Sequence, residues 1–317
     1  MNSRDGLTRL VVFPSDSGTR LDSFLAGSTE LSRRAARRLI GEGAVRLNQT
    51  AVRILSRTVE TGDVVEVLRL PPQLGVPRVP KLKPISLLLE DGWICAVDKP
   101  AGTLSQPAAA RRRQKELAMD ELLTLHLALE QGQRPFLRVV HRLDRDTSGV
   151  MLFGRRPEAL PELVASWREG RIGRTYLAVV EGRPALGSRI IEAPIARDRS
   201  HVWRFGVAAA GRPARTEVRV LSRGNEDTSI VACILASGRT HQVRVHLAHI
   251  GHPVAGDRLY GASRTSASRA LLHAFRLTLP HPCSNKLVRL QAPLPTDLET
   301  FLPADLGTSV VAQLRDV

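Results

Sequence analysis

A short polar segment, residues 141–149, holds the side chains of this chain that are best suited to chemistry. It reads His-Arg-Leu-Asp-Arg-Asp-Thr-Ser-Gly and carries two carboxylates, Asp144 and Asp146, with Arg145 between them. Carboxylates beside guanidinium groups stay ionised and can act as a nucleophile or as a general base. The same residues would also form a structural ion-pair network, and composition alone favours that plainer interpretation.

Two other chemistries fit the segment less well. Asp144 and Asp146 could be the paired carboxylates of a glycosidase-like hydrolase, and Ser148 could be a nucleophile beside a histidine. Loop hydroxyls more often satisfy backbone groups, so we expect Thr147 and Ser148 to be structural. For the same reason we expect Asp146 to be a hydrogen-bonded loop carboxylate.

A histidine-rich stretch in the last third of the chain has a spacing that suggests a metal cluster. Its members are His241, His246, His249 and His252. Neither a cysteine nor an acidic ligand accompanies them, so the sequence predicts no metal site.

The composition points to a polyanionic partner. The chain has 317 residues, with 46 basic against 31 acidic side chains and a formal net charge of +15. Such a balance favours nucleic acid first and an anionic membrane second. An apolar content of 43% argues against wholesale disorder. No apolar run approaches the roughly 18 residues of a membrane span.

Features of the termini and cysteines predict a cytoplasmic protein. The first residues lack the apolar core of a signal peptide. The three cysteines, Cys95, Cys233 and Cys283, are far apart and odd in number, which is typical of a reducing compartment.

A basic helix is expected near the amino terminus. Ser32 is placed to cap a helix over 33–40, on which alanine and aliphatic side chains share one arc. The opposite arc holds four arginines: Arg33, Arg34, Arg37 and Arg38. A solvated helix face would usually include glutamates for pairing, so this face is expected to contact phosphates.

The surrounding pattern predicts two domains. The first domain is expected at residues 1–70, with a core at 18–67. It resembles the small RNA-binding domain named after a small-subunit ribosomal protein (the S-four type). The features that match are the basic helix, a strand at 45–48 and a turn at 62–65. A basic linker with five prolines covers 71–84, a catalytic domain 85–305 and a tail 306–317. Strands outnumber helices without alternating with them, which predicts an α+β fold. A helix at 115–131 is expected within the second domain, after a basic loop at 107–115.

The segment at 141–149 resembles the signature of the RluA-type RNA pseudouridine synthases. Further blocks similar to those of the family occur in its order: 98–102 (with Asp98 for the usual Asn), 174–178 (Arg-Thr-Tyr-Leu-Ala), 211–217, 237–246 (Ser-Gly-Arg-Thr-His-Gln-Val-Arg-Val-His), 251–257 and 272–274. The resemblance covers about residues 85–295. It implies the family's fold, in which the catalytic domain has a mixed, largely antiparallel sheet. It also implies the family's activity, the isomerisation of uridine in RNA to pseudouridine.

The resemblance also implies roles for residues. Asp144 corresponds to the catalytic carboxylate, Arg244 to the arginine that pairs with it, and Tyr176 to the active-site tyrosine whose ring stacks on uracil. Arg142 is expected to contact RNA where the uridine is flipped out. Because substrate and product are isomers, no cofactor and no metal is implied.

The RNA target is expected from the domain order. The layout is similar to that of synthases that modify large-subunit (23S) ribosomal RNA, although relatives with the same layout modify tRNA. A non-catalytic RNA-binding factor for ribosome assembly is the remaining alternative. We expect RNA as the partner, no membrane association and a monomer.

Overall fold

The computed structural model describes residues 7–68, 84–107 and 116–302. The chain divides into two compact units, residues 1–85 with 106–138 and residues 86–105 with 139–317. Apart from Pro84 and Pro107, the expected linker at 71–84, basic loop at 107–115 and tail at 306–317 lie outside the described residues.

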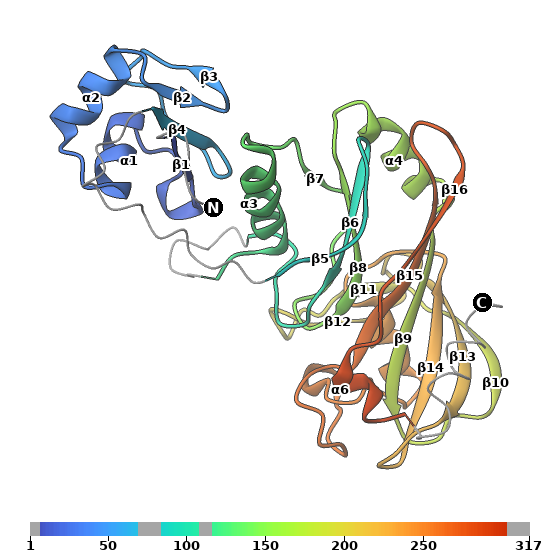
Figure 1. Cartoon of the computed structure of the whole chain (residues 1–317). Coiled ribbons are helices and arrows are strands. Elements are labelled where there is room, and N and C mark those ends of the chain that lie inside the picture. Colours follow the sequence, from blue (N-terminus) through green and yellow to red (C-terminus); the bar gives the residue numbers. More distant parts are fainter. Residues whose placement is uncertain (1–6, 69–83, 108–115, 303–317) are drawn as a thin grey trace. The chain divides into compact units, whose positions relative to one another are not determined.

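The first unit is a small α+β domain (Figure 1). Its elements are β1 (Leu7–Val11), a 3-10 turn (Pro14–Asp16), α1 (Leu21–Ser28), α2 (Arg33–Gly41), β2 (Val45–Leu47), β3 (Thr50–Ala51), β4 (Val64–Leu68) and α3 (Met119–Gln131). The sheet has the order β1-β4-β2-β3, and its pairs are antiparallel. Buried side chains of α1, α2 and the strands form its core.

Two helices of this unit illustrate how local sequence and packing combine. The Ser32 side chain accepts a hydrogen bond from the backbone N–H of Ala35, so it caps α2 as predicted. The helix expected at 115–131 begins at Met119. Its Leu125 and Ala128 pack against Val11 and Val64 of the amino-terminal sheet. This helix therefore belongs to the first unit and not to the catalytic domain, where the sequence order had placed it.

The second unit is built on one large sheet. Its strands are β5 (Ser86–Glu90), β6 (Ile94–Lys99), β7 (Arg138–Val139), β8 (Ser148–Gly154), β9 (Gly173–Glu181), β10 (Gly187–Glu192), β13 (Arg215–Arg223), β14 (Thr228–Leu235), β15 (Leu272–Pro280) and β16 (Leu287–Gln291). The main path is β10-β13-β14-β9-β15-β8-β6-β5. All neighbours on it are antiparallel except β8 and β15, which are parallel.

Helices and a separate hairpin complete the second unit. They are α4 (Ala159–Arg168), α5 (Gln242–His249), a 3-10 turn (Arg258–Tyr260), α6 (Thr296–Glu299) and the hairpin of β11 (Ile195–Arg197) and β12 (Phe205–Val207). Apolar clusters lie on both faces of the middle strands, with alternate residues of β9 pointing to each. The predicted α+β class with a mixed, largely antiparallel sheet is confirmed.

Gly149 shows why the polar segment ends in glycine. Its φ is +112°, and a Cβ atom there would lie 2.3 Å from the carbonyl oxygen of Ala274 on the neighbouring strand. Only a residue without a side chain permits this approach of β8 to β15. Among the described residues, no helix has the length and apolar character to cross a membrane.

Candidate active site

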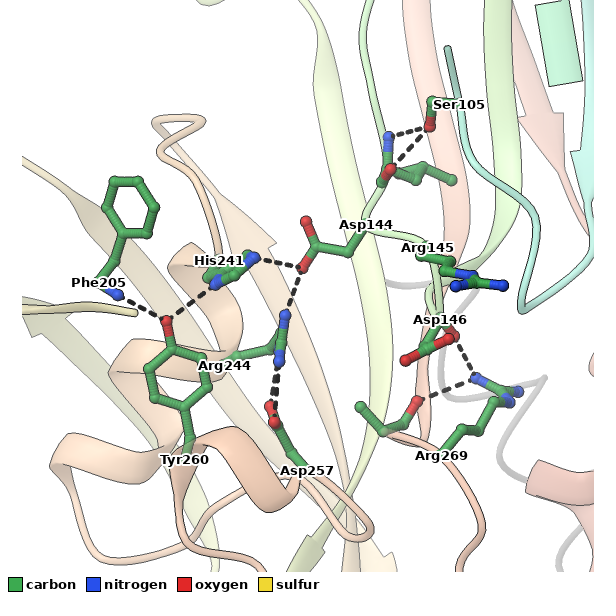
Figure 2. A network of polar contacts seen from close by, with 12 residues as sticks. Ser105, Asp144, Arg145, Asp146, Phe205, His241, Arg244, Asp257, Tyr260 and Arg269 are labelled. Carbon is green, nitrogen blue, oxygen red and sulfur yellow. Dashed lines mark hydrogen bonds and ion pairs between the residues drawn. The ribbon is translucent and has the colours of Figure 1, made fainter. Parts of the chain in front are cut away.

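Asp144 lies in the loop between β7 and β8, and its side chain is 29% exposed. Its Oδ2 atom accepts a hydrogen bond from Nη1 of Arg244 at 3.0 Å. Residues 100 positions apart are thus brought together, as the resemblance implied for this pair (Figure 2). The contact fixes one oxygen of a carboxylate that solvent can still reach.

Arg244, on α5, is itself held by a second carboxylate. Its Nε and Nη2 atoms donate to Oδ2 and Oδ1 of Asp257 at 2.6 and 2.9 Å. Asp257 is 2% exposed. Burial opposes the charge of the guanidinium, but the hydrogen bonds and charges of Asp257 and Asp144 together raise the pKa of Arg244 above its ordinary value. A permanently charged donor therefore faces Asp144.

A histidine and a tyrosine border the same carboxylate. Nε2 of His241 lies 3.8 Å from Asp144 Oδ2, and Nδ1 lies 2.9 Å from the hydroxyl of Tyr260. That hydroxyl also accepts the backbone N–H of Phe205 at 3.0 Å. Burial lowers the pKa of His241, although the Asp144 charge opposes this. The imidazole ring thus links the Tyr260 hydroxyl to the Asp144 carboxylate.

The backbone on either side of Asp144 is held by hydrogen bonds from the end of β6 and from the segment that follows it. The Ser105 hydroxyl donates to the carbonyl of Leu143 at 2.7 Å and accepts its N–H at 2.9 Å. The ammonium of Lys99, which is fully buried, donates to the carbonyls of Pro100, Thr103 and Arg145 at 3.0, 2.7 and 3.0 Å. Burial lowers the pKa of Lys99 to about 8.

The rest of the loop is held from its other side. Arg269 donates to the carbonyl of Asp146 at 2.9 Å and binds both carboxylate oxygens of Asp297. The sequence led us to expect that the Asp146 carboxylate would be hydrogen-bonded within the loop. In the structure the side chain of Asp146 is exposed, and its backbone carbonyl accepts the bond from Arg269 instead. Ser148 is buried, and its hydroxyl pairs with Nδ1 of the buried His273 at 2.9 Å. A substrate could not reach this serine, which agrees with a structural role.

Tyr176 lies on β9 and is half-buried. Burial raises the pKa of its phenol to about 12, with a further contribution from the charge of Asp144. The phenol is therefore neutral near pH 7, and its ring is a surface on which a base could stack. Arg142, two residues before Asp144, has an exposed side chain.

Two histidines that the sequence drew attention to are structural. His141 accepts the N–H of Leu152 and stacks on Trp167, and burial lowers its pKa to about 3. His246 is buried between the Thr216 hydroxyl and the Ala193 carbonyl. In the described parts of the chain, no three histidine, cysteine or acidic side chains are grouped to hold a metal.

The four arginines of α2 are all exposed, but they are not equivalent. Arg37 and Arg33 contact Oδ2 of Asp22 at 2.8 and 3.4 Å, and Arg38 lies 3.7 Å from Glu42. Asp22 is fully buried; burial opposes its charge, but Arg37 and Arg20 hold its pKa well below the usual range. Three of the four arginines therefore have acidic partners within the fold, and phosphate contact by this face stays a prediction. Their acidic partners are Asp22 on α1 and Glu42 at the end of α2.

Several residues of the site were not assigned a role from the sequence. Lys99 and Asp257 stand within the blocks that resemble the family, which is the signal that could have found them. Ser105, Tyr260 and Arg269 reach the site only through the tertiary fold.

Comparisons with known proteins decide the family. A family model described as RNA pseudouridylate synthase matches residues 94–249, and an S4 domain model matches residues 19–65. A protein of Chloroflexus aurantiacus called "Uncharacterized RNA pseudouridine synthase" is 39% identical over 296 residues, which cover 92% of each chain. This chain belongs to the RNA pseudouridine synthases of the RluA type. It is an isomerase that acts on RNA.

Other relatives of this synthase carry more specific names. "Ribosomal large subunit pseudouridine synthase D" of Xylella fastidiosa is 36% identical over 94% of this chain and 93% of its own. "Ribosomal large subunit pseudouridine synthase C" of Vibrio cholerae is 32% identical over 90% and 93%. Among solved structures, "Human RNA Pseudouridylate Synthase Domain Containing 1" matches with a TM-score of 0.61 and 23% sequence identity. The match covers 75% of this synthase and 97% of the human chain, so the two share a fold.

Proposed function

We propose that this synthase converts specific uridines of large-subunit (23S) ribosomal RNA to pseudouridine, with Asp144 as the catalytic carboxylate. The observation that carries the proposal is the placement of Asp144. Its carboxylate is partly exposed and is bound to Arg244, and the buried Asp257 anchors Arg244. Arg244 and His241 both lie against Oδ2 of Asp144, and we infer that Oδ1 is the oxygen that faces substrate.

The chemistry requires no external reactant. The bond between base nitrogen 1 and the ribose breaks, the base turns, and carbon 5 bonds to the same ribose carbon. Carbon 5 gives up a proton and nitrogen 1 gains one, so atoms and electrons balance without oxidant or reductant. Asp144 assists the cleavage, Tyr176 stacks on the flipped uracil, and Arg244 holds the carboxylate in place.

Ribosomal RNA is favoured as the substrate by two observations. Two relatives that match along 94% and 90% of this chain are named for the large ribosomal subunit. The net charge of +15 and the S4 domain suit a large, structured RNA. Arg142 and the basic helix are proposed to contact its backbone.

The test is complementation of a strain that lacks the gene, followed by mapping of pseudouridine in ribosomal RNA and tRNA. We expect wild type to restore sites in large-subunit RNA and Asp144→Ala to restore none. Asp146→Asn is the matched control, because its exposed carboxylate is only two residues away. Sites restored only in tRNA would overturn the ribosomal target. Activity retained in Asp144→Ala would overturn the catalytic assignment.

A further inference from the structure

The tip of the β11–β12 hairpin, residues 198–204, carries an aromatic side chain that the fold leaves uncovered. Trp203 is 74% exposed and Val202 beside it 65%. No other large hydrophobic side chain of the described residues has a higher exposed fraction than Trp203. A tryptophan so exposed needs an explanation, because burying an indole contributes more than burying almost any other side chain.

The tip has a defined shape despite its exposure. The carboxylate of Asp198 accepts the backbone N–H and the hydroxyl of Ser200 at 2.9 and 2.7 Å. Arg197 donates to the carbonyl of Val202 at 2.7 Å, and the N–H of Trp203 reaches Nδ1 of His201 at 3.3 Å. The indole is thus presented on a preformed turn, which reduces the entropy lost when it binds.

The base of the hairpin is joined to the active site. Ile195 packs with Val245 of α5, the helix that carries Arg244. Phe205 donates its N–H to the Tyr260 hydroxyl, as Figure 2 shows. Two guanidinium groups lie over the Tyr260 ring, that of Arg244 at 5.0 Å and that of Arg204 of the tip at 5.7 Å from its centroid. The exposed tip therefore extends from the wall of the Asp144 site.

Charge indicates the kind of partner. Arg197, Arg199 and Arg204 are exposed on or beside the tip, and Asp198, its acidic residue, already accepts two bonds from Ser200. An exposed aromatic ring among guanidinium groups is suited to a single-stranded nucleic acid: the ring stacks on a base, and the arginines meet phosphates.

We propose that Trp203 stacks on an unpaired base of the substrate RNA close to the target uridine, while Arg199 and Arg204 contact the flanking phosphates. The proposal rests on the proposed function, because a uridine that is flipped toward Asp144 leaves its neighbours without a stacking partner. Trp203 thereby contributes to the choice of RNA sites that are already single-stranded or easily unstacked.

The experiment measures binding apart from catalysis. The full-length Asp144→Ala protein is titrated with an oligouridylate of about twelve nucleotides, within the range of single-strand site sizes, and with heparin as a polyanion that has no bases. Trp203→Ala, Trp203→Phe and Leu186→Ala are compared in that background. Leu186 is the control because it is 72% exposed on a different turn. Acrylamide quenching of tryptophan fluorescence reports whether the RNA covers the indole.

We expect oligouridylate to shield the indole from acrylamide, and Trp203→Ala to bind it about tenfold more weakly. Trp203→Phe should recover much of this loss, Leu186→Ala should bind normally, and heparin affinity should not change. Three results would each overturn the proposal: full RNA affinity in Trp203→Ala, equal losses for RNA and heparin, or Trp203→Phe no better than Trp203→Ala. The first would leave the tip as a surface for a protein partner. Because Asp144 is replaced throughout, these results do not depend on whether wild type forms pseudouridine.

Discussion

Arg244 binds Asp257 with two of its nitrogens and Asp144 with the third. Asp257 is almost completely buried, whereas Asp144 is partly exposed. The two carboxylates therefore have different roles: Asp257 anchors the guanidinium group, and the guanidinium group positions Asp144. Such an arrangement holds the proposed catalytic carboxylate in place without closing it off from solvent.

Asp257→Asn is expected to lower kcat about a hundredfold and to change KM much less, because a misplaced Arg244 releases Asp144 from its reactive position. Steady-state rates of pseudouridine formation at varied concentrations of an RNA transcript measure both. Glu192→Gln is the matched control, because it removes an exposed carboxylate 2.8 Å from Arg215. Near-normal kcat in Asp257→Asn would show that Arg244 does not need this anchor.

The buried Lys99 predicts a pH-dependent contribution to stability. Its folded-state pKa of about 8 lies below the ordinary value of 10.5. The cost of burying the charged ammonium is therefore fully present below pH 8. This cost decreases as the pH rises from 8 toward 10.5, because in that range the unfolded chain binds more protons at Lys99 than the folded chain does. The gain is on the order of 3 kcal/mol.

Urea unfolding at pH 7.5 and pH 10 tests this. Wild type should gain stability relative to Lys99→Met between the two pH values. Lys286→Met, which replaces an exposed lysine, should show the same change in the free energy of unfolding between the two pH values as wild type. A parallel pH dependence of wild type and Lys99→Met would contradict the prediction.

Gly149→Ala is expected to reduce the free energy of unfolding by at least about 3 kcal/mol or to prevent folding, because the new Cβ would meet the Ala274 carbonyl in a left-handed backbone conformation. Thermal and urea denaturation measure the change. Gly206→Ala serves as the control, since nothing lies within 4 Å of a Cβ atom there. An unchanged melting temperature in Gly149→Ala would mean that β8 and β15 can separate at no cost.

The arginines of α2 should fall into two groups. Arg37→Ala removes a 2.8 Å contact from buried Asp22 and should destabilise the first unit by about 1–2 kcal/mol. Arg34→Ala should leave stability nearly unchanged. It should reduce by about one the slope of log affinity for RNA against log salt concentration. Denaturant melts and salt-dependent binding separate the two effects, and an unaltered salt slope in Arg34→Ala would exclude a phosphate contact.

The sequence by itself determined the class of the fold, two of its helices and the family. Periodicity predicted α2 and, apart from its first residues, α3, because each buries one face. The motif blocks pointed to Asp144, Tyr176 and Arg244, because they specify residue types that the reaction needs in a set order.

Other features of the protein could be learned only from the tertiary structure, because they depend on contacts between residues that are distant in the sequence. The association of α3 with the first unit, the anchoring of Arg244 by Asp257, and the pairing of Arg33 and Arg37 with Asp22 all join side chains from different elements. Local patterns report which face of an element is apolar, but they do not report what covers that face. The exposed Trp203 is the clearest example, because its sequence neighbours do not show that the fold leaves it uncovered beside the active site.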